Sequence, residues 1–316
     1  GLLKLGSNGA VNGSSGVTVN IANILDLNGY TLSKVLTLGA GAYLANTNTS
    51  NIAEVSGGII VNTSANLSAS ANATLLITTN PITETSGVAS SIMIGGGGRA
   101  GTVSIGVGGN TYTGGTSINI TATLKIASND ALAGTGNISI LTLGKLDVAG
   151  NTVSNAVVIN SPVSNQSLIY STQGTGGALT GGITLPASSA GTLALAAAVG
   201  STLTVSTTQI TGSSILTIGS GSYLGTVVLS GDAVSKSTTS YTGSTNVISG
   251  ATLDGTTTTT YPTATELLGI VARGSASVYN GTQGFARNII MNTSQWSNVM
   301  QLNDSGRPIY NAQVPQ

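Results

Sequence analysis

The segment Leu3-Lys4-Leu5-Gly6-Ser7-Asn8-Gly9-Ala10 returns, with small changes, as Leu124-Lys125-Ile126-Ala127-Ser128-Asn129-Asp130-Ala131. Each copy continues through a turn rich in Gly, Ser and Thr. The first then reaches Leu25-Asp26-Leu27-Asn28-Gly29, and the second reaches Leu146-Asp147-Val148-Ala149-Gly150. At each of these points the second copy lies 121 residues after the first. Self-similarity of this kind indicates a repeat architecture.

The local unit of the repeat is a short triplet, usually apolar-Thr/Ser-apolar, followed within a few residues by Gly, Asn or Asp. Examples are Val17-Thr18-Val19, Val103-Ser104-Ile105 and Leu203-Thr204-Val205, while Leu75-Leu76-Ile77 and Val227-Val228-Leu229 are apolar throughout. Alternation with period two predicts strands, and Gly and Asn are expected to supply the corners with positive φ. Triplets this short can bury their aliphatic side chains by stacking coil on coil.

The fold predicted for residues 1–255 is therefore all-β, a parallel β-helix (β-solenoid). Two further repeated sequence segments support this prediction: Leu36–Leu44 is similar to Leu216–Leu224, and Tyr112–Thr116 is similar to Tyr241–Thr245. The alternative is an ordinary all-β sandwich, which would need longer strands and more aromatic residues between its sheets.

The composition narrows the class of protein. Among 316 residues only 18 are charged, nine of each sign, and there are 45 Gly, no Cys and no His. The apolar fraction of 40% predicts an ordered chain. Nucleic-acid binding is not expected, because no basic stripe is present. Without Cys there is no disulfide framework, and no apolar stretch approaches the roughly 20 residues of a membrane helix.

The repeat units carry a family resemblance. Asn110–Thr116, Leu124–Ile126, Asn129–Gly136 and Leu146-Asp147 together resemble one unit of the autotransporter-associated β-strand repeat of bacterial type V secreted passenger domains. Residues 1–29 look like a second unit, and 226–255 like a degraded third. The resemblance implies a right-handed parallel β-helix displayed outside the cell. It also implies adhesion, aggregation or scaffolding. The chain departs from the family in one respect, since no translocator β-barrel follows the repeats: either the barrel lies beyond residue 316 or the protein is not an autotransporter.

The chain changes character after Pro262, where three of its four Arg residues, its only Phe and its only Trp lie. The five Thr residues 256–260 predict a linker over 256–264. Residues 265–316 are expected to form a small α+β segment, which we interpret as an incomplete domain. We expect helices at 265–279 and around Trp296, a strand at Ile289–Met291, and a turn at Asp304–Pro308.

Residues 289–310 also resemble a segment of tailed-phage major capsid proteins, in Ile289–Asn292, Trp296 and Asp304–Tyr310. That resemblance implies a virion structural protein, capsid or fibre, carrying a solenoid region. The rest of the capsid fold is not found in the sequence. A chance likeness and a chain joined from unrelated sources remain open.

Catalytic chemistry has few candidates. Without His and Cys, a Ser-His-Asp triad, thiol catalysis and zinc–thiolate sites are excluded. Asp26, Asp147 and Asp254 could pair for glycan cleavage, as in a tailspike, but all three follow a Leu in equivalent positions of the repeat. A turn-initiating Asp would recur in this way, whereas a catalytic pair would not. We predict no catalytic, cofactor-binding or metal-binding residues.

Two other features have structural interpretations. Gly95-Gly96-Gly97-Gly98-Arg99 lacks the residues of a phosphate loop or a calcium repeat, so a flexible corner is expected. The tyrosines Tyr43, Tyr112, Tyr223 and Tyr241 could line a sugar-binding face, but stacking between coils is the favoured interpretation.

The sequence thus predicts an extracellular, surface-displayed structural or adhesive solenoid that is not an enzyme and has no cofactor. The chain is interpreted as a mature protein or fragment, on the bacterial cell surface or, alternatively, in a virion. Expected partners are a host-cell surface, a glycan or other copies of the chain in an oligomer or assembly. No nucleic acid and no membrane-spanning role are expected for this segment.

Overall fold

The computed structural model describes residues 1–132, 134–161, 166–174, 176–187, 192–206, 210–230 and 241–256, together with 303–304 and 307–308. The chain divides into two compact units, residues 1–256 and 257–316. The boundary falls at Thr256, the first residue of the predicted linker. The helices predicted at 265–279 and around Trp296, and the strand at 289–291, lie outside the described residues.

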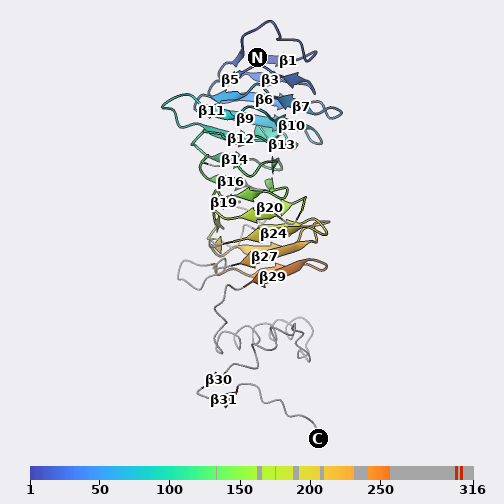
Figure 1. Cartoon of the computed structure of the whole chain (residues 1–316), viewed down its shortest axis with the longest axis vertical. Coiled ribbons are helices and arrows are strands. Elements are labelled where there is room, and N and C mark those ends of the chain that lie inside the picture. Colours follow the sequence, from blue (N-terminus) through green and yellow to red (C-terminus); the bar gives the residue numbers. More distant parts are fainter. Residues whose placement is uncertain are drawn as a thin grey trace. The chain divides into compact units, whose positions relative to one another are not determined.

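The first unit is a three-sided parallel β-solenoid (Figure 1). Two sides are continuous sheets in which ten strands each are described, and the third carries two shorter sheets. The first face contains β1 (Leu2–Lys4), β3 (Ile24–Asp26), β6 (Ala42–Asn46), β9 (Ser64–Ala69), β12 (Ser91–Ile94), β14 (Thr116–Ile118), β16 (Ile138–Leu141), β19 (Val157–Asn160), β22 (Ile183–Thr184) and β25 (Ile210–Thr211). The second face contains β4 (Thr31–Leu32), β7 (Ala53–Val55), β10 (Thr74–Ile77), β13 (Thr102–Ile105), β15 (Thr123–Ile126), β17 (Lys145–Asp147), β20 (Gln166–Ser171), β23 (Thr192–Ala197), β26 (Ile215–Ile218) and β28 (Thr245–Val247).

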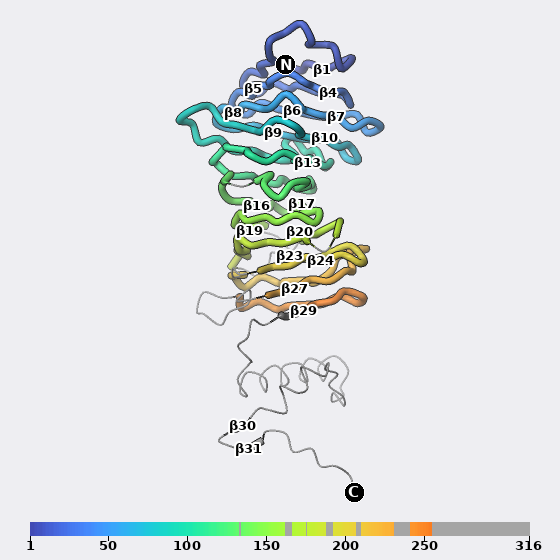
Figure 2. The backbone as a smooth tube through the Cα atoms, in the orientation of Figure 1, coloured from blue at the N-terminus to red at the C-terminus, as the bar shows by residue number. Residues whose placement is uncertain are grey.

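The third face is divided along its length. Its first sheet contains β2 (Val17–Val19), β5 (Leu36–Leu38), β8 (Ile59–Val61) and β11 (Ile82–Glu84). Its second contains β18 (Thr152–Val153), β21 (Gly177–Leu179), β24 (Thr202–Val205), β27 (Thr226–Ser230) and β29 (Thr252–Thr256). The tube in Figure 2 shows the successive coils of this unit stacked one on the next.

The predicted triplets are the strands of this solenoid, and each pairs in parallel with the coil before and the coil after it. On the first face, Leu25, Leu44, Leu67, Ile94 and Ile118 are successive partners across five coils. All five side chains are at most 1% exposed. Burial of each such side chain stabilises the fold by about 2 kcal/mol. The aliphatic column and the parallel pairing confirm the predicted β-solenoid.

An asparagine replaces strand pairing in the gap between the two sheets of the third face. Asn110 is 3% exposed and lies in the irregular segment after β13. Its Oδ1 accepts a hydrogen bond from the Ile82 amide at 2.5 Å, and its Nδ2 donates to the carbonyl of Ala131 at 2.6 Å. The side chain therefore links the coil before it to the coil after it, where no strand does so.

Corners with positive φ are more varied than the sequence suggested. Glycine supplies most of those described, as predicted, but asparagine supplies only Asn28 and Asn72. The other non-glycine residues with positive φ are Ala22, Thr63, Thr79, Thr121, Leu143 and Ala149. Packing between coils therefore outweighs the local preference of these residues for negative φ.

In the second unit the structure describes two short strands, β30 (Asn303–Asp304) and β31 (Arg307–Pro308). They pair in antiparallel fashion, with Asp304 opposite Arg307. This pairing agrees with the turn predicted at Asp304–Pro308.

Candidate functional site

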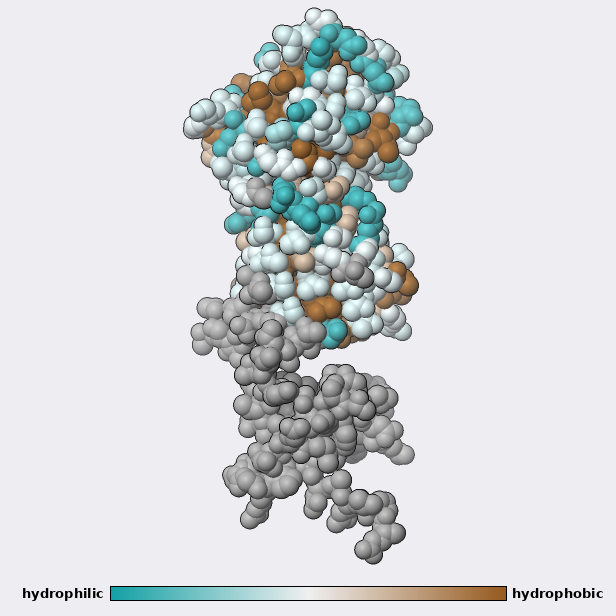
Figure 3. Space-filling model, viewed as in Figure 1, coloured by the Kyte–Doolittle hydropathy of each residue, from teal (hydrophilic) through white to brown (hydrophobic). Residues whose placement is uncertain are grey.

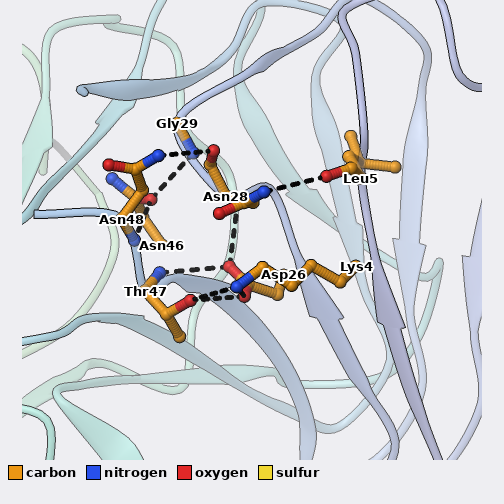
Figure 4. Close-up of polar contacts among 8 residues, drawn as sticks. All are labelled: Lys4, Leu5, Asp26, Asn28, Gly29, Asn46, Thr47 and Asn48. Carbon is orange, nitrogen blue, oxygen red and sulfur yellow. Dashed lines mark hydrogen bonds and ion pairs between the residues drawn. The ribbon is translucent and has the colours of Figure 1, made fainter. Parts of the chain in front are cut away.

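The aspartate of the first repeat copy forms a corner of the solenoid (Figure 4). Asp26 ends β3 and is 2% exposed. Its Oδ1 accepts hydrogen bonds from the amides of Asn28 at 2.9 Å and Thr47 at 3.1 Å, and its Oδ2 accepts one from the Thr47 hydroxyl at 2.5 Å. Lys4 on the preceding coil places Nζ 3.6 Å from Oδ2. The carboxylate thus starts a turn and joins three coils.

Neighbouring amides extend this corner. Asn46 is fully buried, and its Oδ1 accepts hydrogen bonds from the amides of Gly29 and Asn48, both at 3.0 Å. Asn28 Nδ2 donates to the carbonyl of Leu5 at 3.1 Å (Figure 4). Because buried polar groups are costly without partners, this network fixes the path of the chain at the corner.

The second repeat copy builds the same corner on another face. Asp147 ends β17 and is 3% exposed. Its Oδ1 accepts hydrogen bonds from the amides of Ala149 at 2.9 Å and Thr172 at 3.1 Å, and its Oδ2 accepts one from the Thr172 hydroxyl at 2.7 Å. These three hydrogen bonds repeat those of Asp26 atom for atom, while the ion pair of Asp26 with Lys4 has no counterpart here. Both residues are turn-forming aspartates, as their recurrence predicted.

Asp254 differs from the other two. It lies within β29, opposite Val228, and is exposed to solvent. The prediction that it occupies an equivalent position is wrong. The match extends over little more than the Leu-Asp pair. The strand β29 continues beyond Asp254 to Thr256, whereas β3 and β17 end at Asp26 and Asp147.

The three aspartates are therefore not brought together. Asp26 is on the first face, Asp147 on the second and Asp254 on the third. Within the described residues, no group of three or more Asp or Glu side chains could hold a metal ion.

The glycine run forms a tight corner. Residues Gly96–Gly98 make a 3₁₀ turn, and Gly95 enters it with φ of 81°. A Cβ at Gly96 would come within 2.4 Å of the Asn66 side-chain oxygen, so the turn packs closely on β9. Arg99 points back over the ring of Tyr43, 5.9 Å from its centroid.

The four singled-out tyrosines have separate roles. Tyr112 is completely buried, and its hydroxyl bonds the Thr116 hydroxyl at 2.7 Å. Tyr241 is 9% exposed; its hydroxyl accepts from the Leu216 amide and donates to the Ser244 carbonyl. Tyr223 packs on Tyr170 of another coil, with ring centroids 4.7 Å apart. The structure therefore places Tyr112 and Tyr241 among the core residues, and shows stacking between coils for Tyr223.

A groove lies on the outside of the second face, and no pattern in the sequence predicted it. We call it the threonine groove; it encloses about 560 Å³. Its floor has two rows of side chains in register across successive strands, Thr74–Thr102–Thr123 and Leu76–Ser104–Lys125–Asp147–Tyr170. Ile52 and Gln173 also line it.

At one end of the groove, Tyr170 lies in a buried, largely apolar cluster. Leu168, Tyr170, Ala194 and Ala196 form a small buried cluster separate from the main column, with Tyr223 against it. Burial first, and then the negative charge of Asp147, raise the pKa of Tyr170 well above its usual range. Tyr170 therefore stays a neutral hydrogen-bonding phenol at every pH of biological interest.

Comparison of the chain with protein-family models, curated proteins and solved structures gives no match. The resemblances to the autotransporter repeat and to the capsid segment thus remain predictions from the sequence. No helix among the described residues has the length and apolar character needed to cross a bilayer.

Proposed function

We propose that this chain is an extracellular, surface-displayed structural or adhesive β-solenoid with no catalytic activity. One observation carries the proposal. The two carboxylates buried at repeat corners, Asp26 and Asp147, each accept three hydrogen bonds from the scaffold itself. A general acid or nucleophile must instead reach its substrate, and these two groups are 2% and 3% exposed.

The surface of the solenoid supports the same proposal. Its visible face is mostly of intermediate hydropathy, with small separate polar and apolar groups (Figure 3). Every buried side-chain nitrogen and oxygen among the described residues has a partner. A stacked scaffold of this kind offers a long, regular outer surface, which suits binding along its length.

Antibodies against the purified chain would test the proposal on the cells that produce it. Labelling of intact cells, at the level seen after permeabilisation, is the expected result. Labelling only after permeabilisation would refute surface display. Cells that lack the protein should also adhere and aggregate less than their parent. Incubation with bacterial glycans should release no new reducing ends or unsaturated uronates, since such products would reveal a polysaccharide-cleaving enzyme.

A virion structural role is the second candidate. It rests on the capsid-like residues 289–310, of which the structure describes the β30–β31 pair. Purified phage particles from the same culture decide between the two. Antibody labelling of particles by electron microscopy would favour the virion role, and unlabelled particles would eliminate it.

A further inference from the structure

We propose that the threonine groove binds a linear acidic polysaccharide whose carboxylates pair with Lys125. The inference builds on the proposed adhesive function and names the ligand class for one surface. Nothing in the repeat itself requires the groove, so its features can be compared with those of the equivalent corner around Asp26.

The groove has the dimensions of a site for a linear polymer. Its volume of about 560 Å³ lies in the range of ligand sites, roughly 300–1,000 Å³. The floor crosses five strands, β10, β13, β15, β17 and β20. Each adds one side chain to the row from Leu76 to Tyr170, and the first three also add one to the threonine row. Strands in a sheet are spaced by about 4.8 Å, close to the advance of one sugar unit in an extended chain. Successive sugars can therefore meet equivalent side chains.

The lining suits a sugar chain chemically. Thr74, Thr102 and Thr123 form a row of half-buried residues whose hydroxyls can donate and accept hydrogen bonds. Leu76, which is half-buried, supplies apolar surface for the ring C–H groups of a sugar, and Tyr170 adds the 7% of its surface that remains exposed. Since Tyr170 is fixed by Tyr223 and the cluster around it, little conformational entropy is lost when a ligand packs there.

Lys125 gives the groove a free positive charge. Its repeat counterpart Lys4 donates to the Thr47 hydroxyl at 3.3 Å and lies 3.6 Å from Asp26 Oδ2. Lys125 has no hydrogen-bond or ion-pair partner in the described part of the chain, although it neighbours Asp147 across the strands. The three hydrogen bonds to Asp147 do not prevent an ion pair, because Asp26 accepts the same three and still pairs with Lys4, but Lys125 makes no such pair. A half-buried ammonium without a protein partner favours an anionic ligand group.

The second repeat copy also differs from the first where the groove ends. Tyr170 stands opposite Asp147, whereas Ala45 stands opposite Asp26. The corner hydrogen bonds are the same in both copies, so the corner does not need the tyrosine. Tyr170 and the unpaired Lys125 are thus two features that distinguish this site from its structural duplicate.

Binding of the full-length chain to polygalacturonate and to hyaluronan, measured by titration calorimetry, tests the inference. Fully methyl-esterified polygalacturonate is the matched neutral ligand, because it keeps the sugar backbone and loses the carboxylates. We expect the chain to bind at least one of the two acidic polymers. The acidic polymer should bind about tenfold more tightly than its ester or, for hyaluronan, than dextran. Failure to bind either acidic polymer would overturn the proposal.

Matched variants locate the site. Lys125→Gln should abolish the preference for the acidic polymer, whereas Lys4→Gln, at the equivalent corner, should leave it unchanged. Thr102→Glu should weaken binding about tenfold or more through charge repulsion, and Thr37→Glu on the third face should not. Circular dichroism of each variant verifies folding. Binding that survives both Lys125→Gln and Thr102→Glu in folded protein would refute the groove assignment.

The two proposals fail separately. If intact cells are labelled and adhere normally while carrying both groove substitutions, the groove assignment is wrong and surface display stands. If the purified chain shows the expected groove-dependent binding but antibodies reach it only in permeabilised cells, the groove stands and surface display is wrong.

Discussion

Asp26 and Asp147, which are 121 residues apart in the sequence, accept the same three hydrogen bonds from equivalent atoms, but on different faces of the solenoid. Asp26 ends a strand of the first face and Asp147 ends a strand of the second. The corner is therefore a self-contained unit that two different edges of the three-sided coil accommodate.

The first prediction concerns the contribution of this unit to stability. Asp147→Ala removes a buried acceptor and leaves the amides of Ala149 and Thr172 without their partner, which should cost about 2–4 kcal/mol. Asp26→Ala should behave in the same way. Both should lower the urea midpoint of unfolding, and amide exchange should quicken at residues 149 and 172 for the Asp147 variant.

Asp254→Ala is the matched control, because Asp254 is exposed within a strand. Its effect should stay within about 0.5 kcal/mol of zero. Equal urea midpoints for the Asp147 and Asp254 variants would contradict the proposed role of the corner.

The strands of the solenoid could be predicted from sequence because each one is encoded locally. Val17-Thr18-Val19 is β2 residue for residue, and Leu36-Thr37-Leu38 is β5, with Leu36 and Leu38 fully buried. Alternation reports which side chains face the column. The pattern does not depend on how many residues separate one strand from the next.

Neither the face that a strand joins nor the side chains that align on the outer surface of that face could be predicted in the same way. Thr102 follows its register partner Thr74 by 28 residues, but Thr123 follows Thr102 by 21. Because the corners vary in length, spacing along the chain does not reveal which side chains align. The threonine groove, and the shift of the second repeat copy to another face, result from that register.

A second prediction concerns close contact between coils. A Cβ at Gly57 would lie 2.2 Å from the carbonyl oxygen of Lys34, and backbone cannot yield as a side-chain end can. Gly57→Ala should therefore destabilise the protein by about 2 kcal/mol or more. Gly13→Ala is the control, since a Cβ there has no neighbour within 4 Å. Thermal melting of the two variants compares them, and equal melting temperatures would show that the corner relaxes freely.

A third prediction tests the aliphatic column. Ile118 is fully buried between Ile94 and Ile140, its partners on the neighbouring coils. Ile118→Ala should cost about 2–5 kcal/mol, from lost burial and the cavity that remains. Ser117→Ala on the same strand changes an outward side chain and should have an effect within about 0.5 kcal/mol. Urea unfolding distinguishes them, and a cost below 1 kcal/mol for Ile118→Ala would argue against a close-packed column.

The last prediction concerns acid. Glu84 Oε2 accepts hydrogen bonds from the amides of Ser90 at 2.7 Å and Thr113 at 2.9 Å, and these contacts lower the pKa of Glu84 below its usual 4.5. A carboxyl whose pKa is lower in the folded state stabilises that state at pH values above its unfolded pKa. This contribution falls away as the pH drops through the folded pKa.

Between pH 7 and 5 the Glu84 carboxylate should keep its hydrogen bonds to the amides of Ser90 and Thr113, and it should lose them in stronger acid. The amide proton shifts of Ser90 and Thr113 in an NMR titration should therefore move together, with a midpoint below 4.5. In Glu84→Gln that transition should vanish. A midpoint above 4.5, or a transition that persists in the glutamine variant, would mean that another group controls this loop.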